Sequence, residues 1–157
     1  MTDTPIRQLD ADKSERRQWW LKRDMLPHAD GTSYMRRWMM LGGRVRLHMF
    51  DSPDGDMPHD HPFSFMAITL FGYGKETLYS RAEMTHDSGV VAVWPRQRSI
   101  IPLLPRFYEA TDVHRINQCR RLVTLVSAGR RKRDWGFWVP NGYGWRSWVH
   151  HSEYVRP

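Results

Sequence analysis

Two histidines separated by one residue are the first feature of this sequence that could do chemistry. They lie in residues 58–62, which read Pro-His-Asp-His-Pro. In an extended segment, residues i and i+2 project to the same face, so His59 and His61 can present both imidazoles to one point. A third ligand must come from elsewhere in the chain, and His114, which leads into an apolar segment, is the natural candidate. Neutral imidazoles bind Fe, Zn, Cu and Ni, so these three histidines are predicted to hold one divalent metal ion and to leave positions open for water, oxygen or substrate.

The fourth ligand of such a site stays open between three side chains and water. Glu76 could reach the metal or act as a general base, but an ion pair with a basic neighbour is the favoured interpretation. Glu109 and Ser64 are the other two candidates. Asp60 is expected to face away from the two histidines that flank it, because adjacent residues of a strand point to opposite faces, and therefore to be solvated.

One stretch in the first third of the chain has the clear pattern of a strand. Residues 44–50 alternate strictly between polar and apolar side chains, which places Val45, Leu47 and Met49 on one face. Strict alternation of this kind is typical of a half-buried β-strand.

Further short strands separated by turn residues follow. Residues 63–71 form a nearly continuous apolar run, after which Gly72 and Gly74 are expected to turn the chain into a strand at 75–79. Many short strands at this spacing favour an antiparallel sandwich or barrel, and about eight of them in one domain suit a jelly roll. The remaining strands are predicted at 89–94, 99–104, 113–116, 122–126 and 135–139.

The N-terminal part of the chain is predicted to be helical. Residues 12–25 carry Trp19 and Trp20 among charged side chains, as in a short amphipathic helix that Pro27 would end. At 157 residues the chain has the length of one domain. This domain, residues 1–157, is expected to comprise the helix at 12–25, a barrel core at about 33–140 and an aromatic C-terminal tail at 141–157.

Most of the chain, roughly residues 33–126, resembles the cupin superfamily. Residues 55–76, with the histidine pair ahead of a hydrophobic strand and glycines, resemble the first cupin motif, and the segment that ends at His114 resembles the second. The resemblance implies an all-β cupin (jelly-roll, RmlC-like) barrel. Cupins usually place a glutamate four or five residues after the second histidine, where this sequence has Phe65 and Met66. The sequence therefore departs from the three-histidine, one-glutamate pattern.

In lacking that glutamate, the sequence is similar to the thiol (cysteine) dioxygenases, which hold Fe(II) with three histidines. Residues 34–36 (Tyr-Met-Arg) and 75–79 also resemble that family. The resemblance implies that Arg36 binds the carboxylate of a substrate, which a guanidinium can do through two parallel hydrogen bonds. The family's serine–histidine–tyrosine relay should fall near residues 122–127, which here contain neither histidine nor tyrosine. The start of the motif and the Trp-Gly-Phe-Trp of residues 135–138 are also similar to uncharacterised bacterial and phage cupins.

These features predict a metal-binding cupin that is an Fe(II)-dependent dioxygenase-like oxidoreductase acting on a small anionic substrate, with Zn or Ni as alternative metals. Whether the protein is an enzyme at all stays open. The alternative is a non-catalytic binding module whose basic, Trp-rich surface contacts nucleic acid or a protein partner. A sugar isomerase or epimerase is a third, less favoured candidate. The surface in question comprises residues 130–133 (Arg-Arg-Lys-Arg), Trp135, Trp138, Trp145 and Trp148, whose tryptophans are expected to close one end of the barrel or to cover a homodimer contact.

The composition sets limits on partners and location. The formal net charge is +7, but the basic residues are scattered along the chain, which favours a generally basic surface over a dedicated nucleic-acid site. No apolar stretch reaches the roughly 20 residues of a membrane span, so no membrane partner is expected. The N-terminal residues have no apolar signal region, and the single cysteine, Cys119, has no partner for an internal disulfide. A cytoplasmic location is therefore expected.

Overall fold

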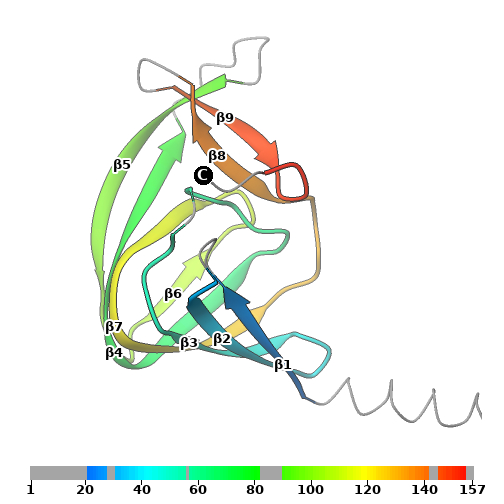
Figure 1. Ribbon diagram of the computed structural model, residues 1–157, viewed down its shortest axis with the longest axis vertical. Coiled ribbons are helices and arrows are strands. Elements are labelled where there is room, and N and C mark those ends of the chain that lie inside the picture. Colours follow the sequence, from blue (N-terminus) through cyan, green and yellow to red (C-terminus); the bar gives the residue numbers. More distant parts are fainter. Residues whose placement is uncertain (1–20, 28–30, 56, 82–89, 142–144, 155–157) are drawn as a thin grey trace, which may run out of the picture.

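The described residues form one antiparallel sheet of nine strands and no helix. The structure is a computed structural model (Figure 1), and it describes residues 21–27, 31–55, 57–81, 90–141 and 145–154. This part of the chain contains no helix that could span a membrane. The strands are β1 (Lys22–Pro27), β2 (Ser33–Met40), β3 (Val45–Phe50), β4 (Phe65–Arg81), β5 (Val90–Ile100), β6 (Pro105–Tyr108), β7 (Val113–Ala128), β8 (Gly136–Pro140) and β9 (Trp145–His150).

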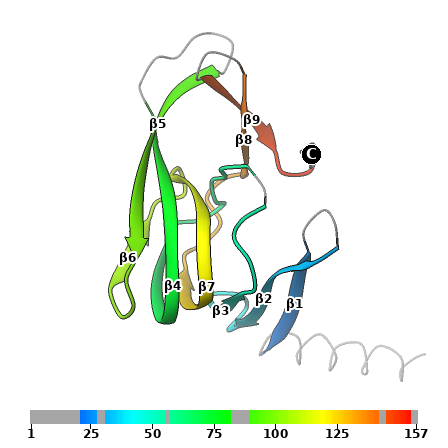
Figure 2. The ribbon, with the colours of Figure 1, turned by 60° about the vertical axis from the view of Figure 1, so that its left-hand side comes forward.

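The sheet curls round on itself, as Figures 1 and 2 show from two sides. Its strand order is β1-β2-β3-β7-β4-β5-β9-β8, and β6 pairs with the first part of β4. The long strands β4 and β7 pair with each other over most of their length, β3 pairs with β7, and β5 and β6 pair with β4. The predicted all-β fold is confirmed for the described residues.

The N-terminal helix predicted at residues 12–25 is wrong where the structure describes it. Lys22–Pro27 is the strand β1, which pairs antiparallel with β2, while residues 12–20 lie outside the described part of the chain. The burial of β1 alternates, with Asp24 and Leu26 less exposed than their neighbours. The backbone pairing to β2 therefore overrides the amphipathic pattern, which residues further towards the N-terminus dominate.

The turn predicted at Gly72 and Gly74 is also wrong, because β4 runs through both glycines. Irregularities in its pairing with β7 occur at this point, and Gly72 adopts a φ of +92°. A Cβ atom at Gly72 would lie 2.1 Å from the carbonyl oxygen of Arg121 on β7. The glycines thus allow two strands to approach closely at a bulge and do not end a strand.

Two other strands are longer than the sequence pattern indicates. β5 continues through Pro95, which pairs with Tyr79 of β4, while only the start of β5, at Val90 to Ala92, also pairs with β9. Beyond Ala92 the second edge of β5 has no strand partner among the described residues, and a proline is tolerated at such an edge. The strands expected at 113–116 and 122–126 are both parts of β7.

Two clusters of buried, largely apolar side chains line the hollow that the sheet encloses. One buried cluster comes from β2, β3, β5 and β7, and a smaller one, built on Ala67, Tyr108 and Val126, comes from β4, β6 and β7. Since these clusters fix the strands on both sides of the hollow, the inward-facing polar residues between them are held on rigid elements. The larger cluster consists of Met35, Phe50, Ile100, Ile116 and Leu122.

Replacing Gly72 by alanine should destabilise the protein severely. The added Cβ atom meets backbone that cannot move without breaking the β4–β7 ladder, so we expect a loss of more than about 3 kcal/mol in the free energy of unfolding. Gly31→Ala is the matched control, because Gly31 has a φ of +82° but nothing within 4 Å of the added Cβ atom. Its loss should stay near about 1 kcal/mol. Urea unfolding measures both, and equal losses would contradict the steric explanation.

Candidate metal centre

The segment that carries His59 and His61 closes the barrel between β7 and β8. The backbone N–H groups of His59 and His114 each donate to the other residue's carbonyl oxygen, at 3.1 and 3.0 Å. On its other side, His59 forms a bridge to Phe137 of β8. The chain of pairings from β7 through β4, β5, β9 and β8 back to β7 is therefore complete only through this short segment.

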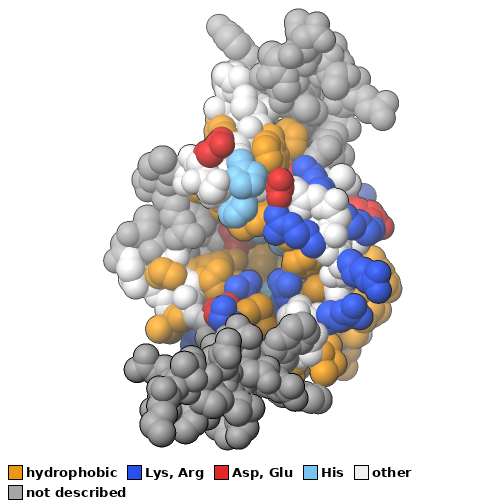
Figure 3. All heavy atoms as spheres, turned by 90° about the vertical axis from the view of Figure 1, so that its right-hand side faces the viewer, with side chains coloured by type: hydrophobic (Ala, Val, Ile, Leu, Met, Phe, Trp, Pro, Cys, Tyr) orange, Lys and Arg blue, Asp and Glu red, His pale blue; other side chains and the backbone are white. Residues whose placement is uncertain are grey.

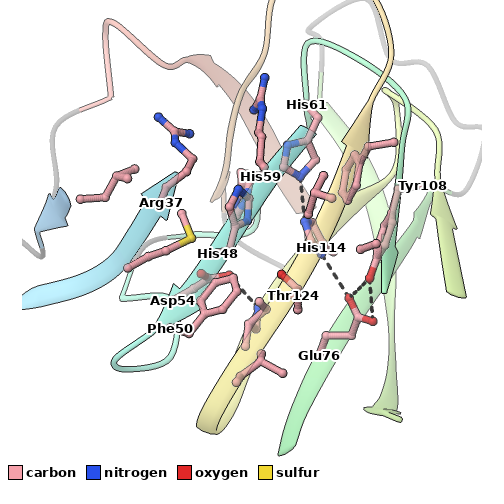
Figure 4. Close-up of a pocket in the computed structure, with 18 of the residues that line it drawn as sticks. Arg37, His48, Phe50, Asp54, His59, His61, Glu76, Tyr108, His114 and Thr124 are labelled. Carbon is pink, nitrogen blue, oxygen red and sulfur yellow. Dashed lines mark hydrogen bonds and ion pairs between the residues drawn. The ribbon is translucent and has the colours of Figure 1, made fainter. Parts of the chain in front are cut away.

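This pairing brings the three predicted histidines together. Each of His59, His61 and His114 offers one ring nitrogen to a group whose atoms all lie within 4.8 Å of one another. His59 and His61 project from the closing segment and His114 from β7, so that their rings converge from two elements (Figure 4). The group could hold a metal ion.

The spacing of two of these nitrogens suits a shared metal ion. The Nε2 atoms of His61 and His114 lie 2.8 Å apart, close enough to share a proton as well. Two nitrogens about 2.1 Å from one metal ion, at right angles to each other, would lie about 3 Å apart. Burial, together with the charges of His114 and His59, lowers the pKa of His61 well below the usual 6.5. His61 is thus neutral at physiological pH, which is the form that binds metals.

Glu76 of β4 contacts the His114 ring on the side away from His61. Its Oε2 atom lies 3.2 Å from Nδ1 of His114, the ring nitrogen on the side away from His61. A carboxylate at this position accepts the Nδ1 proton and leaves the Nε2 lone pair directed into the cluster. Glu76 therefore orients a candidate ligand, and it does not belong to the group of atoms that could contact an ion.

Two further residues fix Glu76 in its ionised form. Tyr108 donates its hydroxyl to the carboxylate at 2.9 and 3.0 Å, and Nε of Arg98 donates at 2.7 Å. Burial raises the pKa of Glu76, but hydrogen bonds and charge from His114 and Arg98 outweigh burial and lower it to about 2. Burial and the charge of Glu76 raise the pKa of Tyr108 to about 12, so its hydroxyl stays a donor. The favoured expectation of an ion pair at Glu76 agrees with this geometry.

Asp60, between the two histidines, is fully buried, so the expectation that it is solvated is wrong. Its Oδ1 accepts the backbone N–H of Gly136 at 2.8 Å, and its Oδ2 accepts the indole N–H of Trp148 at 3.1 Å. Trp138 donates at 3.4 Å and Arg133 forms an ion pair at 3.2 Å. Asp60 does face away from the histidines, but what lies on that side is β8 and β9, not solvent. It ties the histidine segment to the end of the barrel.

The other two candidate ligands lie away from the cluster. The Ser64 hydroxyl donates to Glu109 at 2.7 Å, and neither residue lines the cavity that contains the histidines.

The basic, Trp-rich surface is partly engaged within the protein. Arg131 pairs with Asp134 at 2.5 Å, and Lys132 donates to Ser64 at 3.2 Å. Trp135 stacks on His151, with ring centroids 4.8 Å apart. Together with the contacts of Trp138 and Trp148 to Asp60, this favours the interpretation in which the tryptophans close one end of the barrel.

Arg36 lies outside the cavity. Its guanidinium forms a two-pronged contact to Asp51, with Nη2 at 2.6 Å from Oδ1 and Nε at 3.1 Å from Oδ2. The neighbouring Arg37 points to the other face of β2 and lines the cavity instead. The role of Arg36 as a carboxylate anchor stays a prediction.

The histidines open into a cavity of about 270 Å³. Figure 3 shows a hollow on this side of the molecule, with Lys and Arg side chains gathered beside it. The lining is mostly apolar and aromatic, and such a cavity admits a small molecule of metabolite size. Apart from the three clustered histidines and Glu76, its polar and charged lining residues are Tyr34, Arg37, Arg46, His48, Asp54, Arg106, Tyr108 and Thr124.

Sequence reasoning missed Arg46 and His48, which line the cavity from β3. They alternate with Val45, Leu47 and Met49, the apolar set of that strand. The signal that could have found them is a charged residue and a histidine two apart in a strand, the same spacing that identified His59 and His61.

No protein-family model and no curated protein matches this chain. Among solved structures, Fe(II)-HppE with the alternative substrate (S)-1-HPP aligns with a TM-score of 0.44 and 9% identity, over 69% of this chain. The DMSP lyase DddQ from Ruegeria pomeroyi DSS-3 aligns with a TM-score of 0.40 and 10% identity, over 87% of this chain. The alignment spans 56% of each of those two proteins. Likeness at this level defines neither a family nor a reaction for this chain.

Replacing Asp60 by alanine should destabilise the barrel strongly. Several donors, among them two indole N–H groups, would lose a buried acceptor, so we expect a loss of about 3–5 kcal/mol in the free energy of unfolding. Asp134→Ala is the control, because it removes an exposed carboxylate from a fully solvated ion pair and should leave the unfolding midpoint unchanged. Chemical denaturation followed by tryptophan fluorescence measures both. A small effect at Asp60 would show that Asp60 does not tie the histidine segment down.

Glu76 should make the protein sensitive to acid. Its folded-state pKa, about 2, is lower than its ordinary pKa of 4.5, so its stabilising contribution is present above pH 4.5 and is lost as the pH falls towards 2. The contribution is on the order of 3 kcal/mol. In Glu76→Gln, stability at pH 7 should fall while its decline between pH 5 and 2 becomes shallower. The exposed Glu109→Gln should keep the wild-type profile, and parallel profiles for all three proteins would contradict the assignment.

Proposed function

We propose that this protein is a metal-dependent enzyme in which His59, His61 and His114 hold Fe(II) and which oxidises a small anionic substrate with molecular oxygen. The observation that carries the proposal is the convergence of three ring nitrogens within 4.8 Å at the wall of a cavity. Zn or Ni are the alternative ions, since three imidazoles accept each of them. A bound Fe(II) would supply the redox and oxygen chemistry that amino-acid side chains lack.

The residues around the histidines favour a catalytic over a structural site. Structural zinc sites are closed by four protein ligands, whereas the described residues offer three here, and the cavity adjoins them. No carboxylate of the described residues belongs to the group, because Glu76 is engaged with His114. Three neutral ligands would leave the full positive charge of the ion available to attract an anionic substrate.

The histidine cluster is also shielded on its sides. Phe65 lies against His61 with ring centroids 4.7 Å apart, and Phe137 lies 5.9 Å from His59. Aromatic walls keep the imidazoles in place and exclude water from the flanks of the site, which strengthens electrostatic interactions inside it. The binding face is thus restricted to the cavity.

Metal analysis of the purified protein is the first test. Elemental mass spectrometry should find close to one equivalent of metal in the wild type and a loss of at least tenfold in His59→Ala or His114→Ala. His150→Ala is the control, since His150 of β9 is not in the group. An absence of metal, and no uptake from Fe(II), Zn or Ni solutions, would contradict the site.

Oxygen uptake then separates an oxygenase from other metal enzymes. With Fe(II) loaded, an oxygen electrode should record consumption that depends on an added small carboxylic acid or thiol and disappears in His114→Ala. A protein that binds iron fully but consumes no oxygen with a panel of such compounds would contradict the oxygenase proposal and leave the metal site intact.

A further inference from the structure

A second polar cluster lines the same cavity from β2 and β3. His48 of β3 lies opposite Arg37 of β2 in the strand register, and Arg46 lies two residues before His48 on the same face. Figure 4 shows Arg37 and His48 on the side of the cavity formed by these strands. The two clusters face a common space, because both line one cavity.

Arg46 is a cation without a carboxylate. Its Nε donates to the carbonyl oxygen of Gly43 at 2.7 Å, and its guanidinium lies over the ring of Phe63 at 4.3 Å. Among the described residues it forms no ion pair, whereas Arg37 pairs with Asp24 at 2.8 Å. Burial and the charge of Arg37 lower the pKa of Arg46 to about 10, which still leaves it protonated at neutral pH. This wall therefore carries more positive than negative charge.

Some buried polar atoms on this wall have no hydrogen-bond partner among the described residues. Nε2 of His48 and Nε of Arg37 are both buried and make no hydrogen bond to the described residues. Burial and the charges of Arg37 and Arg46 lower the pKa of His48 to about 3, so the imidazole is neutral and can donate one hydrogen bond. Buried polar atoms are nearly always paired, and a ligand in the cavity would pair these.

We propose that Arg46, His48 and Arg37 form an anion subsite that binds a carboxylate or phosphate group of the substrate. The inference rests on the proposed function, and it specifies the substrate class as a small molecule with an anionic group at one end and a metal-directed group at the other. A cavity of about 270 Å³ accommodates such a molecule, and the apolar lining between the clusters, which includes Val126, suits a short carbon chain. Arg46, fixed by Gly43 and Phe63, is the principal anchor.

The test measures the affinity of simple anions for the full-length protein. Inorganic phosphate and succinate are titrated by calorimetry into the wild type in two states, stripped of metal and loaded with Zn(II). We expect Arg46→Met to weaken binding at least tenfold and His48→Leu about fivefold in both states. His48→Gln, which restores an N–H donor, and Arg46→Lys, which restores the charge, should recover part of the loss. Arg96→Met is the control for charge alone, because Arg96 is exposed on β5 and should leave the affinity unchanged.

Three outcomes would overturn the subsite. Affinity that requires Zn(II) and is equal in the wild type and in Arg46→Met would place the anion on the metal. A loss confined to Arg36→Met would move the anchor to the outer face of β2, beside Asp51. No measurable affinity of the folded wild type for either anion would show that the arginines serve the fold, and thermal melting of each variant identifies the folded ones.

Failure of this inference is distinguishable from failure of the proposed function. Metal content is measured on the same preparations, and the stripped protein should bind the anions whether or not iron is the native metal. Full metal occupancy with no effect of Arg46→Met or His48→Leu would reject the anion subsite alone. Arginine-dependent anion binding in a protein that takes up no metal would reject the metal centre and keep the subsite.

Discussion

The antiparallel bridge between His59 and His114 is the interaction on which the rest of the structure depends. It joins a segment of only a few residues to β7, and the opposite side of that segment pairs with β8. The same two residues thus complete the backbone circuit of the barrel and supply two ring nitrogens of the histidine cluster. Because strand geometry fixes the backbone hydrogen bonds of this bridge, the relative position of these two imidazoles follows from the closure of the barrel.

Charge is distributed unevenly across the interior. Behind His114 lies the carboxylate of Glu76, which accepts hydrogen bonds from Tyr108 and Arg98. Across the cavity stand Arg37, which pairs with Asp24, and Arg46, which forms no ion pair among the described residues. An anion entering this space would be drawn to the arginines while its other end faces the neutral imidazoles. In the proposed anion subsite, this asymmetry would select an orientation as well as a sign of charge.

The histidine cluster can be predicted from the sequence because it depends mainly on the local spacing of its residues. The i, i+2 spacing of His59 and His61 fixes a shared face, and the pairing with His114 only needs one further strand. Cavity-lining side chains were harder to predict where only the face of a strand distinguishes them, since a shift of one residue moves every side chain to the opposite face. Arg36 and Arg37 differ by such a shift, and only Arg37 lines the cavity. In the strand at 44–50 both faces are partly buried, so alternation did not reveal which set faces the cavity.

Tertiary pairing accounts for the other differences between sequence and structure. Gly72 looks like a turn residue, yet its role is set by the carbonyl oxygen of Arg121, a neighbour distant in sequence. The sequence around Asp60 suggests a solvated side chain, but β8 and β9 cover it. Lys22–Pro27 forms a strand because it pairs with the edge of β2. None of these partners is visible from the local pattern, whereas the all-β class depends on composition and turn spacing along the whole chain.

Protein groups make the contacts that close the barrel. Its two apolar clusters draw on β2 to β7, and the closing segment is held by backbone hydrogen bonds and by Asp60. In small zinc domains, by contrast, the ion replaces a core and the chain unfolds without it. Here strands and Glu76 contact the imidazoles, and these contacts would orient the ring nitrogens towards a bound metal ion. Pre-organisation of this kind is what a reactive centre requires, because the protein then spends little binding energy on ordering the ligands.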